Sequence, residues 1–332
     1  MTGLLLVGVV AERDGLFAGA GGLLARVRAE PRVLLLLSLA LVALVTAILN
    51  LDTSVFFLTP VLLHLARRRG VDETAFLYGS VFMSNAASLF LPGSNLTNLI
   101  VLHGESTSGA QFLARMWSAA LVSATVTALA LLALYWRPLG APSEPAPEPA
   151  PARFGLGAVG VILATAFVLV LASPALPVLA CGIAVVILGR VRGARIREAV
   201  DVRLLGLLFT LAVALGWVGR AWHGPETFAD DLGRVGTAVA AAVSSIAINN
   251  LPAAVLFAPD PPHHARAFLI GLNLGPNLAV TGSLSALLWL RVARGLGARP
   301  SVRTYSLLGL VLVPLSLGAA VGALWLVAPG RL

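Results

Sequence analysis

The chain has 332 residues, of which 58% are hydrophobic and only 11% are charged, and its mean hydropathy is +0.92. Soluble domains average roughly 25% charged residues, so this composition excludes an ordinary soluble protein and predicts one polytopic membrane domain. The net charge of +8 comes entirely from arginines gathered in short loops, a pattern that sets membrane orientation, so we expect no nucleic acid partner.

Apolar runs long enough to cross a hydrocarbon core of ~30 Å recur along the chain. They lie at 33–49, 110–136, 154–172, 174–190, 203–219 and 303–328. The proline-rich stretch at 138–153 lacks apolar periodicity and is typical of a semi-rigid linker. It divides the chain into a first transmembrane repeat at 1–137 and a second at 154–332.

The two halves resemble each other. ILNLDTSVFF at 48–57 and INNLPAAVLF at 248–257 share five of ten residues. Further along, residues 85–99 match residues 273–287 with one residue inserted. We interpret this as an internal duplication, with a hairpin and a broken helix in each half.

Arginine-rich loops indicate how the halves are oriented, because such loops face the cytoplasm. They lie at 18–32, 66–73, 137–153, 190–203 and 291–303. In this arrangement the hairpin at Asn50 enters the membrane from the cytoplasm and the hairpin at Asn249 enters from outside. The prediction is an all-α polytopic protein of the bacterial plasma (inner) membrane, with a cytoplasmic linker and two inverted-topology repeats containing re-entrant hairpins and broken helices, as in many secondary transporters.

The first repeat is expected to lack two spans. Thr2–Leu16 align with 203–217, so the spans at 154–172 and 174–190 have no counterpart in the first half. Either the chain is naturally reduced or its start has been placed too late. We expect a groove beside residues 1–17, where two further helices would pack.

Proline and glycine interrupt two of the helices, at Pro92-Gly93 and at Gly275-Pro276. Irregular backbone is tolerated at membrane depth only where protein buries it or it lines a watery cavity. Polar side chains cluster at these breaks and at the hairpin tips, and we expect them to form one substrate site. Its members are Asn50, Thr53, Asn85, Ser94, Asn95, Thr97, Asn249, Asn250, Asn273, Thr281 and Ser283. The alternative is that they only hold helices together.

Asp52 is the only acidic residue deep in the apolar region of either repeat. Ionisable residues at this depth are costly and often functional. We expect Asp52 to be an ion-coupling site for a proton or Na⁺. The alternative, compatible with the first, is an N-cap for a helix at 53–66.

Enzyme functions find little support. The chain has no lysine, which excludes a P-loop lysine and a Schiff base. His263 and His264 lie in a proline-rich loop without carboxylate or cysteine ligands, so a solvated loop is favoured over a metal site. We expect no catalytic residue, no bound metal and no cofactor beyond the coupling ion.

Four stretches resemble the bacterial arsenite/antimonite permease family, within the ion transporter superfamily that includes citrate and dicarboxylate carriers. They are LDTSVFFLTPVL at 51–62, NAASLFLPGSNLTNLI at 85–100, INNLPAAVL at 248–256 and LGPNLAVTGSLSALLWL at 274–290. The resemblance implies the re-entrant hairpins and broken helices of that superfamily. Family members tend to carry aspartates where this chain has Asn85 and Asn273, and a lysine at Asn277.

A site rich in amides and hydroxyls, without a fixed cation, suits a neutral solute such as As(OH)3 or Sb(OH)3. We therefore predict proton-coupled efflux of arsenite or antimonite. Two alternatives stay open: an ion-coupled transporter of an organic or inorganic anion, and a truncated membrane subunit without independent activity. The sequence leaves open whether the chain forms a homodimer or works with a partner ATPase.

Overall fold

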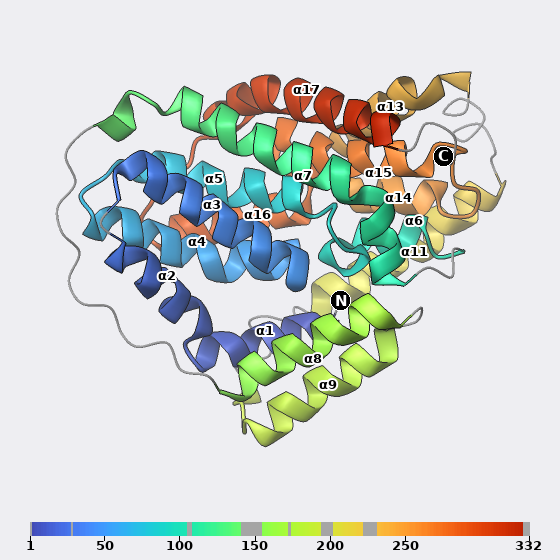
Figure 1. Ribbon diagram of the computed structural model, residues 1–332. Coiled ribbons are helices and arrows are strands. Elements are labelled where there is room, and N and C mark those ends of the chain that lie inside the picture. Colours follow the sequence, from blue (N-terminus) through green and yellow to red (C-terminus); the bar gives the residue numbers. More distant parts are fainter. Residues whose placement is uncertain are drawn as a thin grey trace.

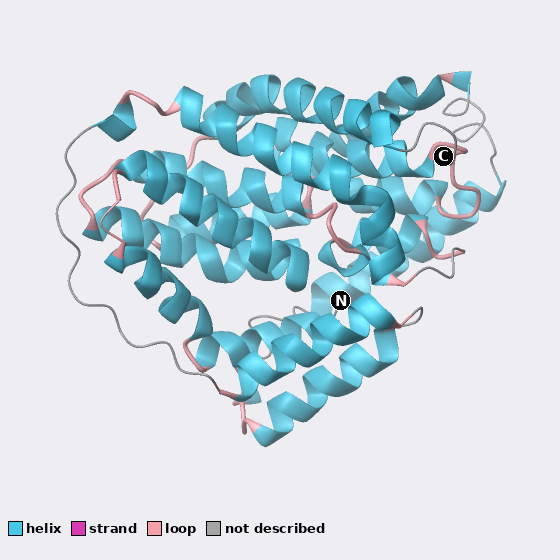
Figure 2. Cartoon of the chain, in the orientation of Figure 1, coloured by secondary structure: helices cyan, strands magenta, loops and turns pink. Residues whose placement is uncertain are grey.

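A computed structural model describes residues 2–27, 29–104, 108–140, 155–171, 174–193, 202–221 and 231–327. Every regular element in these ranges is helical (Figure 2). The predicted linker at 138–153 lies outside the described residues except for Pro138–Gly140, which form the short 3-10 turn η2.

The first half contains α1 (Thr2–Arg13), α2 (Leu16–Arg26), α3 (Pro31–Ile48), α4 (Leu51–Arg68), α5 (Glu73–Ala87), the 3-10 turn η1 (Pro92–Ser94), α6 (Leu96–Val101) and α7 (Gly109–Leu134). The second half contains α8 (Leu156–Val170), α9 (Ala175–Leu188), α11 (Val202–Ala221), α13 (Gly233–Ile248), α14 (Asn250–Phe257), α15 (Ala265–Leu274), the 3-10 turns η3 (Gly275–Leu278) and η4 (Val280–Gly282), α16 (Leu284–Gly295) and α17 (Val302–Val327). The six predicted spans coincide with α3, α7, α8, α9, α11 and α17 to within about two residues at each end.

Three helices in the described part of the chain are long and apolar enough to cross a membrane, namely α3, α7 and α17. The shorter apolar helices include α2, α8, α9 and α13. In Figure 1, α7 and α17 lie side by side along one edge of the molecule. The helices α1, α8 and α9 form a separate layer at the opposite edge (Figure 1).

Two helical hairpins dominate the middle of the molecule, α3–α4 and α13–α14. Their tips break directly after the matched isoleucines, because α3 ends at Ile48 and α13 ends at Ile248. Asparagine follows in both tips, and its side chain caps the next helix. The repeated sequence therefore predicts both turns correctly.

The open end of the α3–α4 hairpin lies among the arginine-rich loops. Arg69 donates hydrogen bonds to the carbonyls of Val27 (2.9 Å) and Ala29 (2.9 Å), and Arg67 donates to the carbonyl of Leu296 (2.9 Å). The guanidinium of Arg32 lies 3.9 Å from the ring of Trp136. These contacts join the loops before α3, after α4, after α7 and after α16 at one end of the molecule.

The α13–α14 hairpin opens at the other end. Helix α17 runs from one end to the other. Ser301, just before α17, bonds to Tyr78 in the second turn of α5, the helix that follows α4. At the far end of α17, Trp325 lies beside Arg234 in the first turn of α13. Elements next to the open ends of the two hairpins thus lie near opposite ends of α17.

Helix α1 packs against α8 and α9 through small residues. A Cβ on Gly3 would lie 2.5 Å from the carbonyl oxygen of Val178, and one on Gly182 would lie 2.6 Å from the carbonyl oxygen of Gly3. Small residues allow helices in a membrane to approach this closely. A groove lies beside Val9, Glu12 and Phe17, and its walls are α1, α2, α4 and α16. That two further helices would pack beside residues 1–17 stays a prediction.

Candidate functional site

The two broken helices, α5–η1–α6 and α15–η3–η4–α16, pass each other at the centre of the molecule. Each break exposes the N-terminus of a half-helix, whose first amides need a partner. Asn95 caps α6 by accepting a hydrogen bond from the amide of Thr97 (3.2 Å). Ser283 caps α16 by accepting one from the amide of Ala286 (3.1 Å). Both capping residues belong to the predicted site.

Asn273, at the end of α15, is the centre of a buried polar cluster. Its Oδ1 accepts hydrogen bonds from Nδ2 of Asn95 (2.7 Å) and from the hydroxyl of Ser88. Its Nδ2 donates to Oδ1 of Asn98 (2.9 Å) and to the carbonyl of Leu269 (2.8 Å). Asn273 is wholly shielded from solvent. The side chain of Asn273, in the second half, thus bonds to residues before and after the break between α5 and α6.

A second amide pair extends the cluster. Nδ2 of Asn85 donates to Oδ1 of Asn277 (2.7 Å), and Nδ2 of Asn277 donates to the carbonyl of Phe82 (3.4 Å). Asn277 lies within η3, so the irregular turn is itself fixed to α5. Four buried hydrogen bonds between side chains connect the first half of the chain to the second. They join α5, α6 and the break between them to α15 and η3, and each involves Asn273 or Asn277.

The tip of the α3–α4 hairpin lies against the same break. The hydroxyl of Ser94 donates to the carbonyl of Ala47 (3.0 Å) in the last turn of α3. Asn50 caps α4 through its Oδ1, which accepts from the amide of Thr53 (2.7 Å). Asn50 and Thr53 are both buried. The predicted residues of the first hairpin and of the first break therefore form one neighbourhood.

Several buried polar atoms at this neighbourhood have no hydrogen-bond partner in the described part of the chain. Four of them are Nδ2 of Asn50, Oγ1 of Thr53, Oδ1 of Asn85 and Oγ1 of Thr97, and Oγ1 of Thr46 in the last turn of α3 is a further one outside the predicted site. Buried polar groups in proteins are nearly always hydrogen-bonded, and leaving one unpaired costs about 1–3 kcal/mol. Such atoms are therefore candidates for ligand contacts, and all four belong to predicted site residues.

Asp52 connects the hairpin to the second broken helix, because the hydroxyl of Ser285 in α16 donates to its Oδ1. The alternative prediction that Asp52 caps a helix at 53–66 is wrong. Helix α4 begins at Leu51, and Asn50 supplies the cap. Asp52 instead lies half-buried in the first turn of α4, and none of the salt bridges among the described residues includes it.

The second hairpin tip is less enclosed. Asn249 donates through Nδ2 to the carbonyl of Thr281 (2.8 Å) and caps α14 by accepting from the amide of Leu251 (3.2 Å). Thr281 is exposed and offers its backbone to this contact. Asn250 lies buried in the first turn of α14. The sequence match paired Asn50 with Asn250, but the capping residue of the second hairpin is Asn249.

A groove of ≈530 Å³ runs between α1 and α2 on one side and α4 and α16 on the other. Phe56 and Pro60 of α4 line it, and Asp52 lies on the same helix face because residues four apart are neighbours. The groove is largely apolar, with Glu12 as its charged residue. At the inner end of this face, α1 approaches the tip, since a Cβ on Gly8 would lie 2.7 Å from Cγ2 of Thr53.

Four further polar residues belong to this region although the predicted site omitted them: Ser88, Asn98, Asn277 and Ser285. Ser88 follows Asn85 by three residues, so it lies on the same helix face. Asn277 and Ser285 lie in the stretch whose polar residues repeat those of the first half. That repetition was the signal that pointed to them.

Apolar helices broken at their centres, with amides and hydroxyls buried at the breaks, define a multi-pass membrane transporter. The family model described as "Citrate transporter" (CitMHS) matches residues 1–270. The chain belongs to this citrate transporter family, which is a family of transporters and not of enzymes.

Known proteins that are similar to the chain include a pump protein and a transporter of known structure. The arsenical pump membrane protein of Escherichia coli is 24% identical over 328 residues, a match that covers 87% of this chain and 76% of that protein. The crystal structure of the Alcanivorax borkumensis YdaH transporter has the same fold with a TM-score of 0.58 and 15% identity, covering 99% of this chain and 85% of that one. The resemblance read from the hairpin and break sequences is thus confirmed as a distant relationship.

Proposed function

We propose that the chain is a secondary active transporter that exports arsenite or antimonite as a neutral trihydroxide, coupled to protons. The observation that carries this proposal is the mixed character of the four unpartnered polar atoms. Asn50 offers a donor, Asn85 an acceptor, and Thr53 and Thr97 hydroxyls that serve as either. A trihydroxide both donates and accepts, so it matches such a set, whereas a carboxylate only accepts.

The charge of the site distinguishes this proposal from its main alternative, an anionic substrate. Citrate and related anions are usually recognised by arginine or lysine, through charge-assisted hydrogen bonds. The asparagine cluster and the two hairpin tips contain no basic residue, and Asp52 adds a negative charge. An anionic substrate, which the family description favours, would need cations to accompany it into this site.

The proposed architecture is a pair of inverted repeats, residues 1–137 and 154–332. It is supported by the hairpins α3–α4 and α13–α14, which open at opposite ends of the molecule and present matched tips. It is also supported by the arginine-rich loops at one end, which we assign to the cytoplasm of a bacterial cell. The linker at 138–153 would lie on that side.

Asp52 is the proposed proton carrier. Its carboxylate faces Ser285 with no basic residue bonded to it, and the groove beside Phe56 and Pro60 supplies a path from the arginine-rich end. A proton that binds here would remove the charge before the site moves or closes. Na⁺ is the alternative coupling ion, because carboxylate and hydroxyl oxygens are suitable ligands for a hard cation.

The deciding experiment is uptake of arsenite and of citrate into proteoliposomes under a proton or a sodium gradient. We expect arsenite to accumulate with a proton gradient alone. Asp52→Asn should abolish gradient-driven accumulation while leaving exchange of arsenite across the membrane. Accumulation of citrate but not arsenite would overturn the substrate assignment, and uphill transport by Asp52→Asn would move the coupling site elsewhere. Assays of the purified chain also show whether it needs a partner ATPase.

A further inference from the structure

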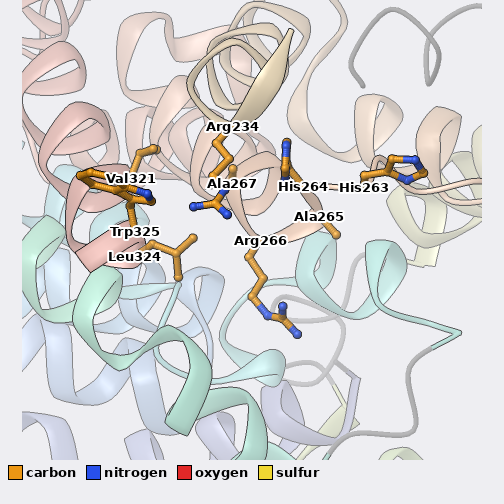
Figure 3. A pocket seen from close by; sticks show the side chains of 9 residues that line it. All are labelled: Arg234, His263, His264, Ala265, Arg266, Ala267, Val321, Leu324 and Trp325. Atoms are coloured by element: carbon orange, nitrogen blue, oxygen red, sulfur yellow. The ribbon is translucent and has the colours of Figure 1, made fainter. Parts of the chain in front are cut away.

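A small pocket lies at the open end of the α13–α14 hairpin, away from the asparagine cluster. The N-terminal turns of α13 and α15 and the C-terminal turn of α17 enclose it (Figure 3). Arg234 comes from α13, His264 and Arg266 from the start of α15, and Trp325 from α17. His263 lies at its edge, so the histidine pair that the sequence assigned to a solvated loop helps to line a pocket.

Arg234 supplies a basic group to this pocket. Two arginines and two histidines line it, and no carboxylate is among the described residues around it. Arg234 is half-buried, and the salt bridges in the described part of the chain, Arg13–Asp14 and Arg67–Glu73, leave it out. Figure 3 shows its guanidinium between the ring of His264 and the indole of Trp325. A partly buried guanidinium in this setting favours an anion as its partner.

The volume limits what the anion can be. The cavity measures ≈60 Å³, whereas one water needs about 10–15 Å³ by this measure and drug-sized ligands occupy about 300–1,000 Å³. A single phosphate-sized group fits, and a large organic anion does not. Arginine is well suited to phosphate because its planar guanidinium donates two parallel hydrogen bonds.

An apolar surface continues from the pocket along α13. Val235, Val239 and Val243 follow one another at intervals of four residues and are 63%, 47% and 58% exposed. Trp325 and Leu326 are also exposed beside the pocket. Tryptophan at the end of an apolar helix marks the interface between membrane and water. A cationic pocket next to this stripe matches an amphiphile better than a free ion.

We propose that this pocket binds the phosphate headgroup of an anionic phospholipid, with Arg234 as its main contact and one acyl chain along Val235, Val239 and Val243. The other polar positions that line the pocket lie at or just before the start of α15, and the indole of Trp325 lies at the level of the headgroup. The bound lipid fixes the open end of the second hairpin at the membrane surface. This site is separate from the transport site, so its test does not depend on the substrate.

The test uses the purified full chain in nanodiscs of phosphatidylcholine to which phosphatidylglycerol is added, with native mass spectrometry to count retained lipids. We expect the unmodified chain to retain phosphatidylglycerol in preference to phosphatidylcholine. Arg234→Gln should weaken this binding about fivefold, the factor that corresponds to ~1 kcal/mol for one basic residue near a membrane surface. Arg234→Lys should restore most of it. Arg291→Gln is the matched control, since Arg291 is an exposed arginine on α16 at the other end of the molecule.

Two results would overturn the proposal. If all variants retain phosphatidylglycerol equally, the lipid binds the surface at large and not this pocket. If inorganic phosphate binds in an Arg234-dependent manner while phosphatidylglycerol shows no preference over phosphatidylcholine, the pocket takes a free anion instead. Thermal unfolding in pure phosphatidylcholine checks that each variant folds. Should Arg234→Gln fail this check, Arg234→Met, which keeps the apolar stem of the side chain, provides the second comparison.

Discussion

Replacing Asn273 by alanine tests whether the asparagine cluster holds the two halves together. The substitution removes the partner of Nδ2 of Asn95 and of Oδ1 of Asn98, while Ser88 keeps the carbonyl of Asn85 at 2.7 Å. Two buried polar groups would thus be left without the bond that Asn273 supplies.

The expected loss follows from these two groups. An unsatisfied buried polar group costs about 1–3 kcal/mol, which gives a loss of ~2–6 kcal/mol. Hydrogen bonds between helices in membranes average only ~0.6 kcal/mol, because the unfolded helices find other partners in the bilayer. Asn95 and Asn98 are 4% and 0% exposed, so neither lipid nor water replaces Asn273, and the larger cost should prevail. We expect a loss of at least ~2 kcal/mol.

The assay is reversible unfolding by denaturant in mixed micelles, monitored by circular dichroism. Ser316→Ala is the control, because this buried hydroxyl donates only to carbonyls of its own helix, chiefly that of Leu312 at 2.7 Å. It should cost ~0.5 kcal/mol, at the low end for a hydrogen bond. If Asn273→Ala unfolds at the same denaturant concentration as Ser316→Ala, the cluster does not connect the halves energetically, and our reasoning fails.

Two further predictions follow from α1 and its neighbours. Gly8→Ala places a methyl group 2.7 Å from Cγ2 of Thr53, so it should cost ~1–3 kcal/mol by overpacking and reduce transport in proteoliposomes. Gly318→Ala, where the added methyl meets no atom within 4 Å, should leave transport unchanged, and equal effects would refute the contact. Burial raises the pKa of Asp14, but the hydrogen bond from the amide of Gly157 and the adjacent arginine outweigh it and hold the pKa below 3.8. The ionised side chain therefore stabilises the fold above pH 3.8, and this contribution disappears as the pH falls through the lowered pKa. Thermal unfolding should show Asp14→Asn less stable at neutral pH and equal to the parent chain at the acid limit, whereas a constant difference would contradict the assignment.

The apolar runs, the prolines that interrupt helices and the repeated sequence predicted most of the fold. The spans follow from apolar runs, because an apolar helix of this length has few other stable environments. The breaks at Pro92 and Pro276 follow from proline, which interrupts helical hydrogen bonding. The hairpin tips follow from the match between Ile48 and Ile248. In each case a local property of the chain determines the local structure.

The partners within the site did not follow from the sequence. A repeat alignment states which residues are equivalent, but it does not state which residues touch. Asn273 and Asn85 are equivalent in the alignment, yet they bond to Asn98 and Asn277 instead of to each other. The second cap is Asn249, whose backbone at φ 76° and ψ 148° is strained for a residue with a side chain, and a repeat alignment carries no signal for such a conformation.

The partners of α1 also determine when this protein can finish folding during its synthesis. α1 leaves the ribosome before α8, whose Gly157 amide donates to Asp14 and lies about 140 residues later in the chain. At roughly 5–20 residues per second, α1 waits on the order of 10–30 s before that helix emerges. During this interval the glycine-rich face that later meets α9 contacts lipid or an insertion factor. Slowed translation before α8 should therefore increase loss of the nascent chain to membrane proteases, while the same delay after α9 should not.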